Sequence, residues 1–468
     1  MVSKDSSYMG SRRERVLTYS GPQYVDYRTD VGRGHVVDFT PIIRHPKTRR
    51  LKEIGQLSPV DLVINDADHK RYTHVLGTFY IGQQIVERSI LYPDEIQMDE
   101  ADRFIFLSIC LLHDIGHGPN SHVYEIIADA YGMPDHKTVG ASIIRNELRG
   151  AIKQAANGNF KRVDLPEEIA GEIENKGSLS RLACDKDRPD KLDYVFRDAE
   201  HCRLGAKPDI HEIAENIIFD GEKSGVKAEA KDALRGFMEA IVTNNKMIYL
   251  LGEVEIVEGF LIRAACYRID NAFEYGIGSG FDPMRGYSMT DSEFNEELQK
   301  HPVSKRLVSS IKNRDARDWV AVSYIKPEGY RRAAEAEMNR LEVEKTEIEE
   351  ASDSQLSFLS EILKLPKLLP FEKRIRQELG LEPEEFEITT SPQIDRLVIK
   401  ESNVATKENG RYTFENIVAP GTTLAADLTD RLKEHHAIRI VTTREKAKKV
   451  LDYVKVNGGP KKLLLEQA

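Results

Sequence analysis

The chain has 468 residues, of which 31% are charged and 40% hydrophobic, with a formal net charge of −10 at pH 7. This composition excludes disordered, collagen-like and fibrous proteins, and the length predicts about two to three domains. The net acidity argues against a surface coated with basic residues, so nucleic acid is not indicated as a partner. It does not exclude a local positive pocket.

The sequence contains no segment that predicts membrane insertion or secretion. The longest apolar run, residues 104–112, falls short of the ~18 apolar residues that a membrane-spanning helix needs. Residues 1–15 are polar and basic and lack the apolar stretch of a secretion signal. Four widely spaced cysteines form no Cys-x-x-Cys pair. We therefore expect a cytoplasmic protein without a membrane partner.

Helical patterns dominate the first three-quarters of the chain. A short basic helix is predicted over residues 46–57, entered through a proline, and an amphipathic helix over residues 71–91. Residues 102–112 are apolar on nearly all sides, which predicts a buried helix at the centre of a helical domain. Further helices are expected over residues 138–156, 165–174, 190–199, 210–218, 231–273 and 330–351.

The last part of the chain changes character, because its residues alternate as in short strands. Strands are expected at residues 385–389, 396–400, 411–417 and 437–442, and a closing helix at 443–456. The predicted fold class is therefore mainly α, a helical core with a small C-terminal α+β lobe. The predicted units are an N-terminal extension (1–24), a core (25–280), a helical extension (281–364) and the C-terminal lobe (365–468).

Histidines and carboxylates are concentrated between residues 74 and 136. The histidines are His74, His113, His117, His122 and His136, interleaved with Asp114, Glu125 and Asp135. A single histidine on an apolar helix is more often a core residue than a ligand. However, His113 and Asp114 directly follow the most hydrophobic helix of the chain. An ionised carboxylate there costs several kcal/mol unless it is paired or bound to a cation, so we expect a metal ion.

Two imidazoles and two carboxylates suit one divalent ion, Mn²⁺, Fe²⁺, Zn²⁺ or Mg²⁺, with open positions for water and a phosphate oxygen. His74 has Arg71 one turn earlier on the same helix face. The last ligand is expected downstream, and Asp190 is the best candidate. Asp190, Tyr194 and Asp198 follow at four-residue spacing and would face a single pocket. An amphipathic helix with apolar residues in the core explains the same segment and is compatible with this interpretation.

Several motifs together carry a resemblance to a known family. They are Leu51–Leu57, Arg71-x-x-His74, His113-Asp114-x-Gly116-His117-x-Pro119-x-Ser121-His122, His136 and Asp190-Lys191-x-Asp193-Tyr194-x-x-Arg197-Asp198. They resemble the HD-domain phosphohydrolases and, within them, the deoxynucleoside triphosphate triphosphohydrolases, which include bacterial dGTPases and the SAM-and-HD-domain dNTPase. The matching segments run from about residue 25 to 205, with fainter similarity beyond. The N-terminal extension is too short for a SAM domain.

The resemblance implies an HD-domain core that holds one divalent metal ion through His74, His113, Asp114 and Asp190. It implies that the metal and nearby cations hold the α-phosphate of a dNTP, that water attacks it, and that triphosphate and a nucleoside are released. His122 would protonate the departing 5′ oxygen, supported by Glu125 where relatives have an aspartate. His117 and His136 would contact phosphate oxygens.

The substrate-binding residues that the resemblance implies are Gln56, Arg71, Lys191, Tyr194 and Asp198. Arg71 and Lys191 would bind the phosphates. The other three residues would recognise the 3′-hydroxyl of the sugar and the absence of a 2′-hydroxyl. Tyr249 is a candidate for the tyrosine that closes the sugar pocket. An acidic segment, residues 253–258, replaces the arginine- and histidine-rich stretch expected there, so base and sugar selectivity stay open. Homo-oligomers and a nucleotide activator are implied as well.

Two other interpretations stay open. The same metal centre can act on a nucleoside monophosphate, a cyclic or signalling nucleotide or another phosphoester, as other HD proteins do. A nucleotide- or nucleic-acid-binding regulator without turnover is the third interpretation. The complete ligand set and His122 argue against it, because a sensor does not need an acid aimed at a leaving group.

Overall fold

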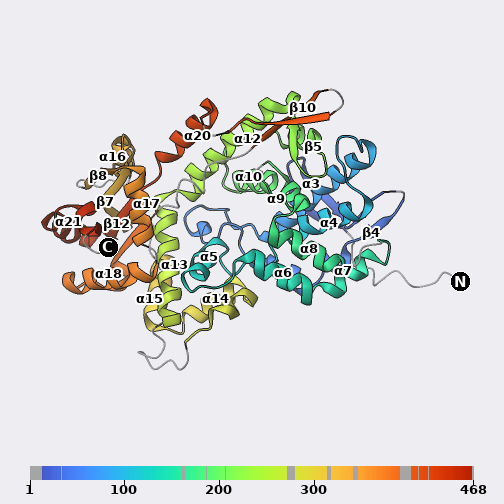
Figure 1. Cartoon of the computed structure of the whole chain (residues 1–468). Coiled ribbons are helices and arrows are strands. Elements are labelled where there is room, and N and C mark those ends of the chain that lie inside the picture. Colours follow the sequence, from blue (N-terminus) through green and yellow to red (C-terminus); the bar gives the residue numbers. More distant parts are fainter. Residues whose placement is uncertain are drawn as a thin grey trace.

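The computed structural model describes most of the chain and confirms the mainly α class (Figure 1). The described residues are 13–32, 34–160, 164–185, 187–205, 207–270, 280–313, 318–340, 346–363, 365–390, 402–408, 411–419 and 421–465. None of the helices in these ranges is both long enough and apolar enough to cross a membrane.

A bundle of helices surrounds α4 (Glu100–Leu112), the central helix of the core. Asp99 and Asp102 cap its start by accepting from each other's backbone N–H, and residues 103–112 are all buried. The predicted helices at 71–91, 165–174 and 190–199 are all found. The helices of this bundle are α3 (Arg71–Leu91), α6 (His136–Asn146), α7 (Arg149–Ala156), α8 (Leu165–Asn175), α9 (Ser178–Cys184), α10 (Pro189–His201) and α11 (Ile210–Glu215). Helix α5 (His122–Ala130) packs instead against α13 (Gly252–Asp270) in a second hydrophobic core.

Helix α3 packs closely against α10, and a glycine allows this approach. A Cβ atom on Gly77 would overlap the side chains of Asp193 and Arg197. The close contact places the first turn of α3 beside the first turns of α10, so His74 and Asp190 become neighbours.

Four short strands precede the core, although the sequence pattern does not predict them. Strand β1 (Arg13–Thr18) pairs antiparallel with β2 (Gly21–Asp26), and β3 (Arg28–Asp30) pairs with β4 (Val36–Asp38). After the short α1 (Thr40–Ile43), the basic helix expected at 46–57 is shorter than predicted. It consists of α2 (Pro46–Arg50) and a 3-10 turn at Leu51–Glu53.

Three longer helical predictions are wrong in their extent. Residues 138–156 form two helices, α6 and α7, and 210–218 ends as a helix at Glu215 and continues as strand β5 (Ile217–Phe219). Residues 231–270 contain α12 (Lys231–Asn244), a π-helical turn (Asn245–Tyr249) and α13 (Gly252–Asp270), and the last part of the predicted helix, 271–273, lies outside the described residues. The π turn matters for the site, because it carries Tyr249.

The segment 281–364 is not purely helical. It contains α14 (Asp291–Leu298), α15 (Pro302–Asn313), β7 (Trp319–Pro327), α16 (Arg331–Arg340), β8 (Glu347–Ala351) and α17 (Asp353–Ile362). The helix expected over 330–351 is therefore wrong at its end. Strand β8 is an edge strand, and edge strands often carry exposed charges, which is why its glutamates resemble those of a solvated helix.

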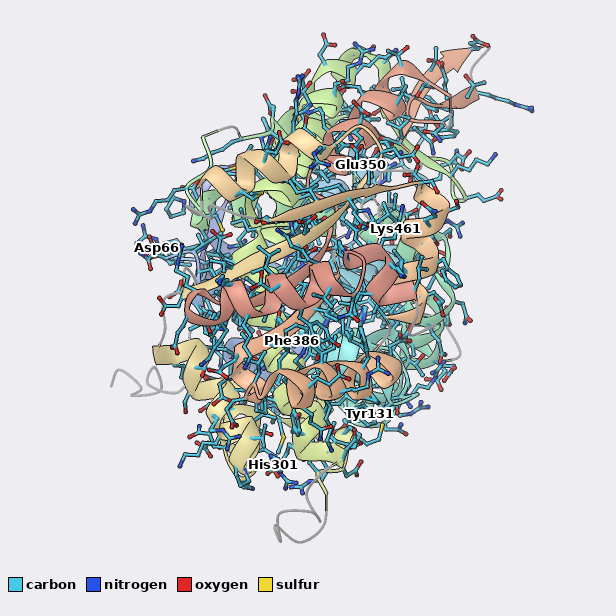
Figure 2. The ribbon with its side chains drawn as sticks, turned by 90° about the vertical axis from the view of Figure 1, so that its left-hand side faces the viewer. Asp66, Tyr131, His301, Glu350, Phe386 and Lys461 are labelled. Carbon is cyan, nitrogen blue, oxygen red and sulfur yellow. The ribbon has the colours of Figure 1, made fainter. Side chains whose placement is uncertain are left out.

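The sheet of the C-terminal lobe has four strands in the order β8-β7-β12-β9. Because β7 and β8 belong to it, the lobe begins before the predicted boundary at residue 365. The predicted strands at 385–389 and 437–442 appear as β9 (Phe386–Thr390) and β12 (Ile438–Thr443), whereas 396–400 lies outside the described residues. Helices α18 (Leu365–Leu379), α21 (Ala447–Val456) and α22 (Pro460–Leu465) complete the lobe, with α21 as the closing helix. Figure 2 looks onto it, where Lys461 Nζ on α22 donates to the Glu350 carbonyl on β8 at 3.1 Å.

The strand expected at 411–417 belongs to a different sheet, beside the helical core. Strands β10 (Asn403–Glu408) and β11 (Arg411–Asn416) form a hairpin, and β10 pairs in parallel with β6 (Ser224–Lys227), which pairs with β5. Helix α20 (Thr423–Lys433) then leads back to the lobe. In Figure 1 this hairpin lies beside α12, well away from β7 and β12.

Candidate metal centre

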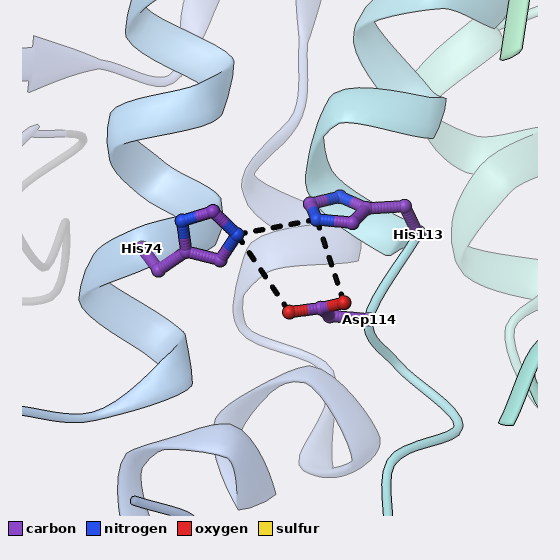
Figure 3. Close-up of side chains that lie close together, drawn as sticks. All are labelled: His74, His113 and Asp114. Atoms are coloured by element: carbon purple, nitrogen blue, oxygen red, sulfur yellow. Dashed lines mark hydrogen bonds and ion pairs between the residues drawn. The ribbon is translucent and has the colours of Figure 1, made fainter. Parts of the chain in front are cut away.

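Three buried side chains, His74 on α3 and His113 and Asp114 at the end of α4, lie close together (Figure 3), and the partly buried Asp190 on α10 lies beside them. The Nε2 atoms of His74 and His113 are 3.3 Å apart. Asp190 Oδ1 lies 3.3 Å from the first of these atoms and 3.5 Å from the second. Asp114 lies 3.7 Å and 3.5 Å from the same two atoms. Donor atoms that share a divalent ion at about 2.0–2.2 Å lie roughly 3 Å apart. The ligand atoms of His74, His113 and Asp114 all lie within 4.8 Å of one another, so these three could hold one ion, and Asp190 lies beside both histidines.

Helix ends place the two carboxylates. Asp114 follows directly after the last turn of α4, and Asp190 is the second residue of α10, where the helix dipole favours negative charge. Burial alone would raise the pKa of Asp190, but the charge of Lys191 and hydrogen bonds with His113 and His74 hold it well below its usual range. The carboxylate is therefore ionised, as a metal ligand must be.

A second carboxylate on α10 orients His74. Asp193 Oδ2 lies 2.9 Å from His74 Nδ1, and Arg197 donates two hydrogen bonds of 2.8 Å to Asp193. Burial acts to lower the pKa of His74, but bonds with Asp190 and Asp193 raise it to about 9. The contact of Nδ1 with Asp193 turns the opposite ring nitrogen, Nε2, toward the cluster.

Arg71 links the cluster to the turn before α5. Its Nη1 donates to Asp114 Oδ2, and its Nε donates to Ser121 Oγ at 2.7 Å. Ser121 in turn donates to the carbonyl of Gly55 at 2.5 Å. The Nη2 of Arg71 is buried and has no hydrogen-bond partner within the described ranges. The Arg71 guanidinium, beside the candidate metal centre, can therefore donate further hydrogen bonds from Nη2.

A histidine and glutamate group adjoins the centre on the other side. Glu125 bonds the Nδ1 of both His122, at 3.1 Å, and His136, whose ring stacks on His117 at 4.1 Å. Although burial would raise the pKa of Glu125, these two bonds hold it below its usual range. His117 Nε2 lies 3.3 Å from Asp114 Oδ1, whereas the His122 side chain is 70% exposed. His117, Glu125 and His136 also have ligand atoms within 4.8 Å of one another.

The predicted substrate residues line up along α10 and the adjoining loops. Lys191 Nζ lies 4.7 Å from the ring centre of Tyr194 and 3.8 Å from Asp190. Tyr249, on the π turn, donates its hydroxyl hydrogen to Asp198 Oδ2. The structure therefore places Tyr249 beside Asp198, and its role in closing a sugar pocket stays a prediction.

Other residues at the site were not singled out from the sequence. Asp193 and Arg197 fall inside a quoted motif, yet only the fold shows that they hold His74. His69 lies 2.8 Å from Asp198 and was missed altogether. Its position two residues before Arg71 is the only signal in the sequence, because its partner is far away along the chain.

Residues 71–195 match the HD domain family. This range begins with α3 and ends within α10, so it includes all four converging side chains. The chain contains an HD domain. Helices α12–α22 and the N-terminal strands lie outside the range matched.

Similarity to curated proteins covers parts of the chain. The uncharacterized protein YwfO of Bacillus subtilis is 32% identical over 153 residues, 32% of this chain and 33% of that protein. Deoxynucleoside triphosphate triphosphohydrolase SAMHD1 of Gallus gallus is 33% identical over 299 residues, 55% of this chain and 48% of that protein. The deoxynucleoside triphosphate triphosphohydrolase SAMHD1 homolog of Dictyostelium discoideum is 28% identical over 336 residues, which are 64% of this chain and 61% of that protein. The aligned region is thus less than two thirds of each relative.

Solved structures with the same fold cover almost all of the chain. A phosphohydrolase from Bacteroides thetaiotaomicron superposes with a TM-score of 0.60 at 16% identity, over 90% of this chain and 97% of that one. A hypothetical protein from Aquifex aeolicus superposes with a TM-score of 0.60 at 17% identity, over 94% of this chain and 100% of that one. The fold therefore extends well beyond the HD domain.

Proposed function

We propose that the protein is a metal-dependent phosphohydrolase that cleaves dNTPs into a deoxynucleoside and inorganic triphosphate. The observation that carries the proposal is the convergence of His74, His113, Asp114 and Asp190, with donor atoms 3.3–3.7 Å apart. The names of the SAMHD1 relatives, deoxynucleoside triphosphate triphosphohydrolases, support the choice of substrate.

The four side chains would hold one divalent ion, Mn²⁺, Fe²⁺, Zn²⁺ or Mg²⁺. Imidazole nitrogens and carboxylate oxygens suit all of these ions, and the set leaves room for other ligands. Such an ion, when bound, polarises a phosphoryl oxygen and lowers the pKa of a bound water.

Arg71 and Lys191 would neutralise the triphosphate. Arg71 Nη2 is buried and has no hydrogen-bond partner in the described part of the chain. A buried donor without a partner costs about 1–3 kcal/mol, which a phosphate oxygen would recover. Fixed donors aimed at phosphate oxygens are the main source of stabilisation in phosphoryl transfer.

His122 would deliver the proton to the 5′ oxygen when the bond between that oxygen and the α-phosphorus breaks. Its ring is 70% exposed, so a substrate can reach it, and Glu125 holds Nδ1 at 3.1 Å. This contact fixes the ring and leaves Nε2 for the leaving group. His117 and His136, stacked beside Glu125, would contact phosphate oxygens.

Gln56, Tyr194, Asp198 and Tyr249 would bind the sugar. Gln56 Oε1 is buried without a hydrogen-bond partner among the described residues, and Tyr249 bonds Asp198. Close packing of an aromatic ring against the ribose excludes a 2′-hydroxyl. We further propose a homo-oligomer in the cytoplasm with a nucleotide activator, in line with the resemblance noted above.

The test is to incubate the purified protein with dGTP and Mn²⁺ in ¹⁸O-labelled water. We expect deoxyguanosine and tripolyphosphate in equal amounts, with the label in the tripolyphosphate, because water attacks the α-phosphorus. A parallel reaction with EDTA should give neither product. Release of orthophosphate or pyrophosphate instead would favour the alternative, an HD hydrolase for another phosphoester. Nucleotide binding without turnover would favour a regulator.

A further inference from the structure

The carboxylate of Asp198 is held from two sides by residues that are distant in sequence. His69 Nε2 lies 2.8 Å from Oδ1, and Tyr249 donates to Oδ2. The His69 and Asp198 side chains are each only 1% exposed. A carboxylate has about four lone-pair positions, so two remain for a further donor after these bonds.

Besides the bond to Asp198, two contacts fix His69. Its ring stacks on His201, at the end of α10, with ring centres 4.3 Å apart. Its carbonyl accepts from the backbone N–H of Gln56 at 2.9 Å. The remaining ring nitrogen, Nδ1, is buried and has no hydrogen-bond partner in the ranges that the structure describes. His69 is therefore rigid, adjoins the proposed sugar pocket and has an unused polar atom.

We propose that His69 is a positioning residue for sugar recognition. It holds Asp198 so that the open lone pairs accept the 3′-hydroxyl of the nucleotide, and this role rests on the proposed function. Without His69, Tyr249 alone among the described residues holds the carboxylate, which can then turn away from the sugar. Removing His69 should therefore weaken the contact between Asp198 and the 3′-hydroxyl, and should leave the binding of the triphosphate unchanged.

The test compares dGTP with 2′,3′-dideoxy-GTP, which lacks only the 3′-hydroxyl. A hydrogen bond to a charged group is worth about 1.5–3 kcal/mol, so the wild type should prefer dGTP by about 10-fold or more in kcat/KM. In His69→Leu this preference should fall to about 3-fold or less. His69→Gln, whose amide can still donate to Asp198, should retain most of it. A purely structural defect would lower both activities alike and leave their ratio unchanged.

His201→Leu is the matched control, because it removes the stacked ring without removing a donor to Asp198. It should retain the wild-type preference, and thermal melting of all variants checks folding. The binding of deoxyguanosine and dideoxyguanosine, measured by calorimetry, gives a readout that needs no turnover. Loss of discrimination in His69→Leu by this measure supports the role even if no dNTP is hydrolysed, which would overturn only the proposed function. An unchanged ratio in His69→Leu, or no discrimination in the wild type, overturns the inference.

Discussion

Asp193 accepts a hydrogen bond from Nδ1 of His74 at 2.9 Å, and so fixes the ring whose other nitrogen faces the candidate metal centre. Arg197 donates to both oxygens of Asp193, and the three side chains are at most 3% exposed. The chain Arg197–Asp193–His74 therefore runs from the interior to the cluster. The position of a candidate ligand depends on a residue outside the ligand set.

We expect Asp193→Asn to weaken metal binding. The amide removes the negative charge and one of the two acceptors that Arg197 uses, so His74 loses its fixed orientation. Loss of such a supporting contact costs about 10–100-fold in metal affinity. Calorimetric titration with Mn²⁺ measures the effect. Glu200→Gln, a neutralised carboxylate near the other end of α10, is the control and should bind Mn²⁺ as the wild type does. Wild-type affinity in Asp193→Asn would refute the supporting role.

Asp114→Ala and His122→Ala should separate metal binding from proton transfer. Asp114 lies within the cluster, so its loss should remove both the metal and the activity. The exposed His122 makes no contact with the four candidate ligands that the structure records, so His122→Ala should keep the metal and slow dGTP cleavage by about 10²-fold or more. Elemental analysis of the purified variants and turnover assays give the two readouts. Normal turnover by His122→Ala would disprove the acid assignment.

The helices whose apolar residues recur at helical spacing could be predicted from the sequence. Helices α3, α4 and α10 have clear apolar faces or an apolar core, and the His-Asp pair after α4 pointed to the cluster. Asp190 could be chosen because it begins a helix that also carries Tyr194 and Asp198. These inferences need only local spacing and the cost of burying charge.

Other features depend on contacts between distant segments. Strand β8 carries charges typical of an exposed helix and is a strand only because it pairs with β7. The π turn that ends at Tyr249 interrupts a continuous helical pattern, and His69 meets Asp198 only in the folded chain. No local pattern encodes these pairings, because their partners are set by tertiary packing.

Gly77→Ala should destabilise the protein, although alanine normally favours a helix. The new methyl group would overlap Asp193 and Arg197 and force α3 and α10 apart. Overpacking of this kind costs about 1–3 kcal/mol of unfolding free energy. Gly236→Ala on α12 is the control, because nothing lies within 4 Å of the added atom. It should be neutral or stabilising by up to about 1 kcal/mol. Denaturant unfolding measures both, and equal stability of the two variants would contradict the tight packing.

A buried glutamate in the lobe predicts a dependence of stability on pH. Glu387, on β9, is fully buried, and neither carboxylate oxygen has a hydrogen bond in the described structure, although Arg263 lies 3.5 Å away. Burial raises its pKa from 4.5 to about 8. Between these values the folded state keeps a proton that the unfolded state has released. The unfolding free energy should therefore fall as pH rises, by about 1.4 kcal/mol per pH unit from this group.

Glu387→Gln should remove this dependence, since the amide stays neutral at every pH. We expect the variant to match the wild type near pH 5 and to be more stable at pH 8, where the wild-type carboxylate is partly ionised without hydrogen bonds. Urea unfolding at pH 5, 6.5 and 8 measures the difference. Glu296→Gln, an exposed carboxylate on α14, is the control and should follow the wild-type curve. If Glu387→Gln and the wild type lose stability in parallel from pH 5 to 8, another group is responsible for the titration.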